Sequence, residues 1–192
     1  EQQTDAILVL GTTAETPTLT LSEEDEIARI SIEQAKGRVP IIVGSGSNNT
    51  MVAIEQSLKY EKMGADALLV ITPYYNKTSK AGMVNHFTQV ADAVHTPVYV
   101  YNVPGRTGVT ISYEALAEIS KHKNIVGIKE ASGDMSLICK FSKLINDNFN
   151  IYSGNDDINV PLLSMGGAGV ISVLANILPK ETHDMAMAYL NG

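Results

Sequence analysis

The chain has only one cysteine, no basic run and no long apolar run. A single cysteine excludes an intrachain disulfide and favours a reducing compartment, so we expect a cytoplasmic protein. This residue, Cys139, follows the apolar pair Leu137 and Ile138. That setting favours a buried structural thiol over a nucleophile.

Charge and hydropathy argue against two classes of partner. The longest apolar runs, such as 67–71 and 98–100, are far shorter than the roughly 20 residues that a membrane span needs. The 14 Lys and Arg residues are outnumbered by 21 Asp and Glu residues, which gives a net charge of -7. No basic stretch alternates with aromatic residues, as it does in many nucleic-acid grooves. We therefore expect neither a membrane nor a nucleic acid as partner.

The sequence also lacks the patterns of metal and phosphate sites. Its histidines, at positions 86, 95, 122 and 183, show no ligand spacing with one another, so we predict no metal site. The glycine-rich stretch 44–49 lacks the Gly-Lys-Ser/Thr ending of a phosphate loop. We interpret this stretch as a turn followed by a helix cap.

The pattern that is present is a repeated strand and helix. The 192 residues, 44% of them hydrophobic, are consistent with a single domain over 1–192. Nearly continuous apolar runs predict strands of a covered parallel sheet at 5–10, 40–43, 67–72, 97–102, 124–129, 149–153 and 168–173. Helical spacing follows each of them, at 21–36, 50–64, 79–94, 111–122, 135–147, 157–165 and 179–190. Three serines give start signals for these helices: Ser22, Ser79 and Ser112.

Such repeats form either a closed barrel or an open doubly wound sheet. Polar or glycine clusters follow six of the strands, at 11–13, 44–49, 72–76, 101–106, 129–133 and 153–156. Their gathering on one rim favours a TIM (β/α)8-type barrel, whose active site lies at the carboxyl ends of its strands. Only seven of the eight strands are visible. We expect the first strand and helix to lie upstream of Glu1, which leaves two sheet edges unpaired.

Lys129, at the end of the predicted 124–129 strand, is the strongest catalytic candidate. The alternation of side chains along a strand places Ile125, Gly127 and Lys129 on one face. Because Gly127 has no side chain, we expect space below the Lys129 amine. A lysine in an apolar pocket has a lowered pKa and can attack a carbonyl as the neutral amine. An isolated lysine is usually a surface charge, but the apolar strand before it and the small-residue turn after it favour chemistry here.

Four polar residues from other strand ends complete the candidate site. Tyr101 is predicted to lie level with Lys129 on the preceding strand, and its phenol could donate and accept protons. Thr12 and Thr13 supply hydroxyls and backbone amides, and Arg106 could grip a substrate carboxylate. The structural alternatives are buried tyrosine rings, threonine turn caps and an exposed loop arginine.

Four motifs in the same order and spacing closely resemble the dihydrodipicolinate synthase (4-hydroxy-tetrahydrodipicolinate synthase) family. They are 11–15 (GTTAE), 72–76 (TPYYN), 101–108 (YNVPGRTG) and 127–133 (GIKEASG). This family belongs with the N-acetylneuraminate lyase type of class I aldolases, and the resemblance covers essentially the whole chain. It implies a barrel enzyme that condenses pyruvate with L-aspartate 4-semialdehyde in lysine and diaminopimelate biosynthesis, without a metal or a cofactor.

The resemblance also implies a role for each matched residue. Lys129 would form the pyruvate imine, and three hydroxyls would relay protons, those of Tyr101, Thr12 and Tyr75. The residue matching Tyr75 reaches into a neighbouring subunit's site in the family, which implies a homo-oligomer, a dimer or a tetramer. The remaining matches are substrate-binding: Thr13 for the pyruvate carboxylate, Arg106 for the semialdehyde carboxylate, and Gly154 and Ile171 near the pyruvate pocket.

Three departures from the family pattern qualify these expectations. Ala14 replaces a usual glycine, which would shift the turn if that position needs a positive φ. Leu21, Glu24 and Val52 stand at positions where lysine-inhibited relatives carry polar or histidine residues. We therefore expect weak or no feedback inhibition by lysine. The chain is also expected to be truncated at both ends, lacking the first strand and helix and the C-terminal helices. The alternatives are therefore an inactive or weakly active barrel acting as an oligomeric scaffold, or a related keto-acid aldolase with another aldehyde.

Overall fold

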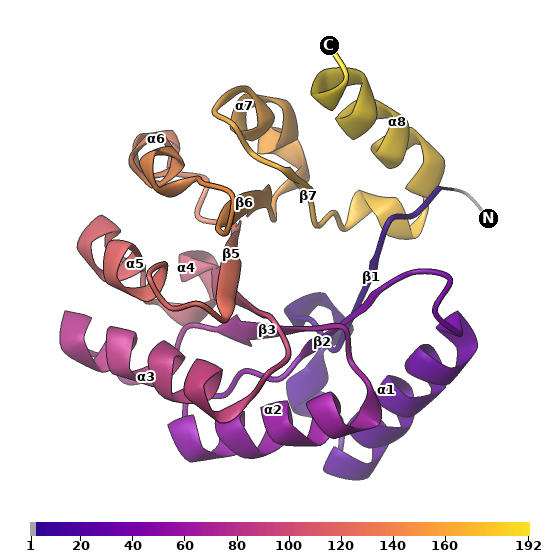
Figure 1. Ribbon diagram of the computed structural model, residues 1–192, viewed down its shortest axis with the longest axis vertical. Coiled ribbons are helices and arrows are strands. Elements are labelled where there is room, and N and C mark those ends of the chain that lie inside the picture. Colours follow the sequence, from indigo (N-terminus) through magenta and orange to yellow (C-terminus); the bar gives the residue numbers. More distant parts are fainter. Residues whose placement is uncertain (1–2) are drawn as a thin grey trace.

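The computed structural model describes residues 3–192, and its core is one parallel sheet whose seven strands follow sequence order. The strands are β1 (Ile7–Val9), β2 (Ile41–Gly44), β3 (Ala67–Ile71), β4 (Val98–Asn102), β5 (Ile125–Glu130), β6 (Asn150–Ser153) and β7 (Gly169–Val170). Figure 1 shows the sheet curling, with its helices outside. Uninterrupted order and curvature are typical of a barrel rather than of a doubly wound sheet, whose strand order reverses. The barrel-type prediction is confirmed.

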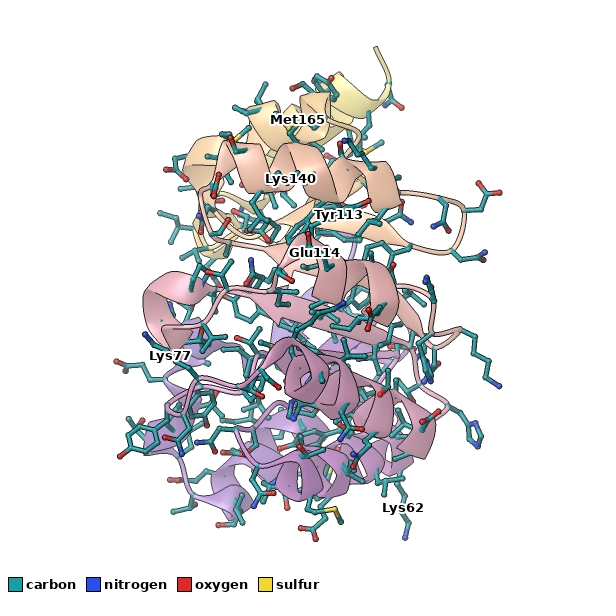
Figure 2. The ribbon with its side chains drawn as sticks, turned by 90° about the vertical axis from the view of Figure 1, so that its left-hand side faces the viewer. Lys62, Lys77, Tyr113, Glu114, Lys140 and Met165 are labelled. Carbon is teal, nitrogen blue, oxygen red and sulfur yellow. The ribbon has the colours of Figure 1, made fainter. Side chains whose placement is uncertain are left out.

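Helices connect successive strands and form the outer layer. They are α1 (Leu21–Ala35), α2 (Thr50–Met63), α3 (Lys80–Ala93), α4 (Pro104–Thr107), α5 (Tyr113–Ile119), α6 (Met135–Phe141), α7 (Asn159–Ser164) and α8 (Pro179–Leu190). Every predicted helix is present, although α5 and α6 are shorter than their patterns. The sequence pattern did not predict α4, a single turn that begins at a proline and ends before Gly108, which lies in the left-handed region. Figure 2 shows this layer from the side, with Tyr113 and Glu114 on α5 and Lys140 on α6.

Side-chain caps fix where these helices begin. Ser79 and Ser112 accept hydrogen bonds from backbone N–H groups of α3 and α5, as predicted. Ser22 does not cap α1. Thr20 does so, because its hydroxyl accepts from Glu23 N at 3.3 Å while the Glu23 carboxylate accepts from Thr20 N at 2.8 Å. Asn49 caps α2, which confirms the turn and cap interpretation of residues 44–49.

The two faces of the sheet bury different amounts of apolar surface. The outer face and the helices enclose a large continuous core that includes Phe87, Ile128 and Phe141. The inner face has a small cluster, whose buried members are Leu69, Tyr101, Val103 and Ala131. Ile125 was predicted to share a face with Lys129, but it packs in the outer core. A register shift between β4 and β5, at Val98 and Tyr99, interrupts the alternation on which that prediction rested.

The N-terminal segment and the last helix lie side by side in this arrangement. Within residues 3–192, β1 pairs only with β2 and β7 only with β6. The segment before β1 reaches α8, where the Asp5 carboxylate lies 2.9 Å from His183 Nδ1 (Figure 1).

In the part of the chain that the structure describes, no helix is both long and apolar enough to cross a bilayer.

Cys139 lies on the exposed face of α6, so the prediction of a buried thiol is wrong. Ile138 and Phe141, three residues apart, take the buried face of this short helix. Cys139 follows Ile138 directly and is rotated away from the core by the helical period. The apolar stretch in the sequence therefore did not indicate burial of its last residue.

Candidate active site

Lys129 projects from the end of β5 toward the inside of the curled sheet. The residue is 5% exposed, and its backbone lies in register with Tyr101 of β4. Its Nζ lies 4.5 Å from the centre of the Tyr101 ring. The expectation that these two residues lie level on neighbouring strands is confirmed.

The surroundings of Lys129 favour its neutral form. The pKa of this amine is lowered from an ordinary value of 10.5 to about 8, and burial is the largest cause. The nearby Arg106 guanidinium contributes to this lowering, while the Asp156 carboxylate opposes it. A larger fraction of the amine is therefore unprotonated near neutral pH than for a surface lysine.

Two glycines leave space for neighbouring side chains, one for Lys129 and the other for the Tyr99 ring. A Cβ on Gly154 would lie 3.0 Å from Lys129 Cε and 2.9 Å from Ala131 Cβ. A Cβ on Gly127 would lie 3.0 Å from a ring carbon of Tyr99 and 2.7 Å from Asn150 O. The space at Gly127 therefore accommodates the Tyr99 ring, and the space beside the amine comes from Gly154.

A hydroxyl pair lies on the same side of the sheet as the amine. Thr12 Oγ1 is 3.4 Å from Tyr101 Oη, and either atom can be the donor. Thr12 begins a short 3-10 turn, η1 (Thr12–Ala14), which follows Leu10 at a φ of 56°. A left-handed backbone at a buried leucine is costly and is often found beside functional sites. Ala14 is helical and has no positive φ, so its replacement of glycine does not strain the turn.

A pocket of about 490 Å³ opens beside Lys129. It is lined by Thr13, Tyr101, Val103, Arg106, Lys129, Gly154, Asn155, Asp156, Asp157 and Val173. Five of the predicted site residues are therefore brought together, namely Lys129, Tyr101, Thr13, Arg106 and Gly154, and Thr12 joins them through Tyr101. Arg106 extends into the pocket from α4, the turn that the sequence pattern did not predict.

Two predicted site residues do not line this pocket. Tyr75 is 86% exposed, with a φ of 77°, and its side chain lies outside the site of its own chain. Ile171 is half-buried just after β7, where its N–H donates to Ser153 O at 2.7 Å. Ile171 thus holds the end of β7 against β6 but is not part of the lining.

Asp156 lines the pocket but was not among the predicted site residues. Its carboxylate accepts a hydrogen bond from the Ser172 hydroxyl, and others from Val173 N at 3.1 Å and Leu174 N at 2.9 Å. Burial would raise its pKa, but these hydrogen bonds outweigh burial and lower the pKa below its usual value. The polar cluster after β6 was the available signal, yet composition alone could not separate Asp156 from its neighbours.

This site can hold and activate a small carbonyl compound that carries a carboxylate. A buried amine with a lowered pKa can attack a carbonyl, and the Thr12–Tyr101 pair can pass a proton. The Arg106 guanidinium offers paired donors to a carboxylate. Among residues 3–192, no three His, Cys, Asp or Glu side chains gather closely enough to hold a metal ion.

The whole chain is similar to proteins of one known family. The model of the dihydrodipicolinate synthetase family matches residues 1–192. A 4-hydroxy-tetrahydrodipicolinate synthase from Clostridium perfringens is 52% identical over 192 residues, which is all of this chain and 66% of that protein. The chain therefore spans slightly less than two thirds of that relative.

Solved structures are similar over nearly the whole chain. The crystal structure of dihydrodipicolinate synthase from Aquifex aeolicus superposes with a TM-score of 0.97 at 38% identity, covering 100% of this chain and 66% of that one. A chloride-inhibited dihydrodipicolinate synthase from Acinetobacter baumannii, complexed with pyruvate, has a TM-score of 0.96 at 39% identity. It covers 99% of this chain and 65% of that one.

Proposed function

The chain belongs to the dihydrodipicolinate synthetase family, and from this membership we propose that it condenses pyruvate with L-aspartate 4-semialdehyde through a Schiff base on Lys129. The product is 4-hydroxy-tetrahydrodipicolinate, an intermediate on the route to lysine and diaminopimelate. The observation that carries the proposal is the buried Lys129 amine, with its pKa near 8, beside Tyr101 and a pocket that holds an arginine.

The reaction assigns a step to each residue. The neutral Lys129 amine adds to the keto carbon of pyruvate and water leaves, giving the imine. A proton then leaves the methyl group, and the resulting enamine carbon attacks the aldehyde carbon of the second substrate. The Tyr101 and Thr12 hydroxyls move these protons, and the new alkoxide takes one of them. The amine of the semialdehyde finally displaces Lys129 from the former keto carbon, which closes the ring and restores the enzyme.

Carboxylate binding is assigned to two sides of the pocket. The turn that contains Thr13 would hold the pyruvate carboxylate, and Arg106 would hold that of the semialdehyde. Gly154 leaves space beside Lys129, because the Cβ of any larger residue would lie too close to Lys129 Cε. We assign Tyr75 to the site of a second copy in a homo-oligomer, because it is exposed and outside the pocket of its own chain.

Trapping of the imine tests the proposal directly. The chain is incubated with pyruvate, reduced with borohydride, and analysed by intact and peptide mass spectrometry. We expect one reduced pyruvate adduct, on Lys129, and none on the Lys129→Met variant. Lys140 is a suitable control position, because it lies exposed on α6, and Lys140→Met should label like the parent. A folded chain that acquires no adduct on Lys129 contradicts the proposal.

The choice of aldehyde is tested separately. Arg106 favours an aldehyde that carries a carboxylate, so turnover with L-aspartate 4-semialdehyde should exceed turnover with an uncharged aldehyde of similar length. Equal turnover of the two aldehydes would favour a keto-acid aldolase with another substrate.

A further inference from the structure

Directly behind Lys129 and Tyr101 lies a buried polar pair, Asn102 and Glu130. Each is the next residue along its strand, and the two are in register as the last pair of β4 and β5. Both are 0% exposed. Because side chains alternate along a strand, this pair faces away from the pocket that the other two residues face.

The pair links the segments that leave both strands. Asn102 Nδ2 donates to Glu130 Oε2 at 2.8 Å, and Asn102 Oδ1 accepts from Ile111 N at 3.1 Å. Glu130 Oε1 accepts from Ser132 N at 2.6 Å. One continuous chain of three hydrogen bonds therefore runs from Ile111 to Ser132.

This series of hydrogen bonds fixes one end of the loop that carries Arg106. Ile111 is the residue at which the connection containing α4 enters the outer core, so its bond to Asn102 ties down the far end of that loop. The near end is fixed at Val103, which is buried in the inner cluster. From there the bonds from Arg106 N and Thr107 N to Val103 O, at 2.9 and 3.1 Å, fold the loop into the α4 turn. With both ends held, the guanidinium is presented to the pocket from a fixed turn.

A buried carboxylate is an expensive way to join two strands that their backbone ladder already joins. Burial raises the pKa of Glu130, while the hydrogen bonds from Ser132 and Asn102 oppose that rise. An apolar pair at these positions would avoid the cost, but it could not hold Ile111 N and Ser132 N.

We propose that Asn102 and Glu130 are positioning residues that hold the Arg106 loop and the turn after Lys129 in the geometry needed to bind the carboxylate-bearing aldehyde. This inference rests on the proposed function. It assigns the pair no contact with substrate, and it separates their effect from imine formation, which depends on Lys129 itself.

Exchanging the two side-chain chemistries gives a sharp test. In Glu130→Gln, one of the two accepting oxygens becomes an NH2 group, which is a donor, so the bond from Asn102 Nδ2 or the bond from Ser132 N is lost. In Asn102→Asp, two carboxylates face each other. In the double variant, an aspartate at 102 accepts from Ile111 N and from the glutamine amide, whose oxygen accepts from Ser132 N, so that every bond is restored.

We expect each single variant to raise KM for the semialdehyde by about tenfold, with pyruvate trapping within about twofold of the parent. The double variant should return to within about threefold of the parent KM. Ser57→Ala is the matched control. It removes a buried hydrogen bond, that of 2.9 Å to Ser45, away from the pocket lining, and it should leave KM unchanged.

The outcomes distinguish this inference from the proposed function. Suppose that Lys129 of the parent forms an adduct. If the single variants then have the parent's KM for the semialdehyde, or if the KM of the double variant does not return toward the parent value, the inference alone is wrong. Absence of an adduct in the parent contradicts the proposed function first. Amide hydrogen exchange of the parent then decides the positioning role, because it needs no substrate and no variant. Slow exchange at Ile111 and Ser132 supports the role, and exchange as fast as at exposed amides overturns it.

Discussion

The inner and outer faces of the curled sheet use the same strands for different purposes. Outside, Phe87, Ile128 and their neighbours form a continuous apolar core beneath the helices. Inside, the buried apolar cluster is small and lies beside an amine, hydroxyls and an arginine. Since burial of apolar area dominates folding stability, the outer face supplies most of the stability and the inner face supplies the chemistry. Substitutions on the two faces should therefore affect different measurements.

The largest expected effect is on the inner face, in Tyr101→Phe. This change keeps the ring 4.5 Å from Lys129 Nζ but removes the hydroxyl that contacts Thr12. Loss of a general acid and base lowers turnover by about 10²- to 10⁴-fold. We expect the imine with pyruvate still to form, so the trapped adduct and the turnover rate should separate.

Tyr99→Phe is the matched control for this prediction. Tyr99 lies two residues earlier on the same strand and packs edge-on against Tyr152, with ring centres 5.6 Å apart. It does not line the pocket. Equal losses of turnover in the two variants would contradict the assignment of proton transfer to Tyr101.

Next in size is a stability effect on the outer face, in Phe87→Ala. Phe87 is 0% exposed in α3, and truncation of a buried phenylalanine costs about 3–5 kcal/mol. Urea unfolding followed by circular dichroism should show this loss. Pyruvate trapping by the fraction that remains folded should match the parent.

An exposed aromatic residue provides the comparison for this variant. Tyr189 is 42% exposed on α8, and Tyr189→Ala should change the free energy of unfolding by no more than about 0.5 kcal/mol. If Phe87→Ala also abolished trapping in folded protein, the two faces would not be as independent as we infer.

The same division explains what could be predicted from sequence. The strands and long helices were predicted because both faces of each strand carry apolar residues and the helices have a regular period. Lys129 and Tyr101 were correctly placed together, since parallel strands in register bring their carboxyl ends level. The four motifs thus contain five of the ten residues that line the pocket, Thr13, Tyr101, Val103, Arg106 and Lys129.

Tertiary detail could not be predicted in the same way. The position of Ile125 depends on a register shift between two strands, and that of Cys139 on which face of a short helix packs inward. Asp156 is recognisable only through its contacts with residues that follow β7. Each case depends on a partner distant in sequence, and no local pattern records that partner.

A smaller effect is expected where the inner face is crowded, in Gly154→Ala. The new methyl group would lie 3.0 Å from Lys129 Cε and 2.9 Å from Ala131 Cβ. Overpacking of this kind costs about 1–3 kcal/mol, and displacement of the amine should slow pyruvate trapping. Gly105→Ala is the control, because its new methyl group would have no neighbour within 4 Å and its φ is not positive. Equal trapping rates in the two variants would contradict the close fit around Lys129.

The effect most specific to the inner face is a pH dependence. Only the unprotonated amine attacks pyruvate, so the trapping rate should rise about tenfold for each pH unit below the pKa and level off above it. With the pKa of Lys129 lowered to about 8, the plateau should begin near pH 8 rather than near 10.5.

Stability should follow the same titration with a defined sign. Between about pH 8 and 10.5 the unfolded chain binds a proton on Lys129 that the folded chain has released, so stability rises with pH across this window. Lys129→Met removes that contribution, and its unfolding free energy should lack the rise. Because burial is the main cause of the lowered pKa and Arg106 a lesser one, Arg106→Gln should move the plateau only slightly, toward higher pH. A large shift in that variant would mean that the charge of the arginine, and not burial on the inner face, sets the reactivity of the amine.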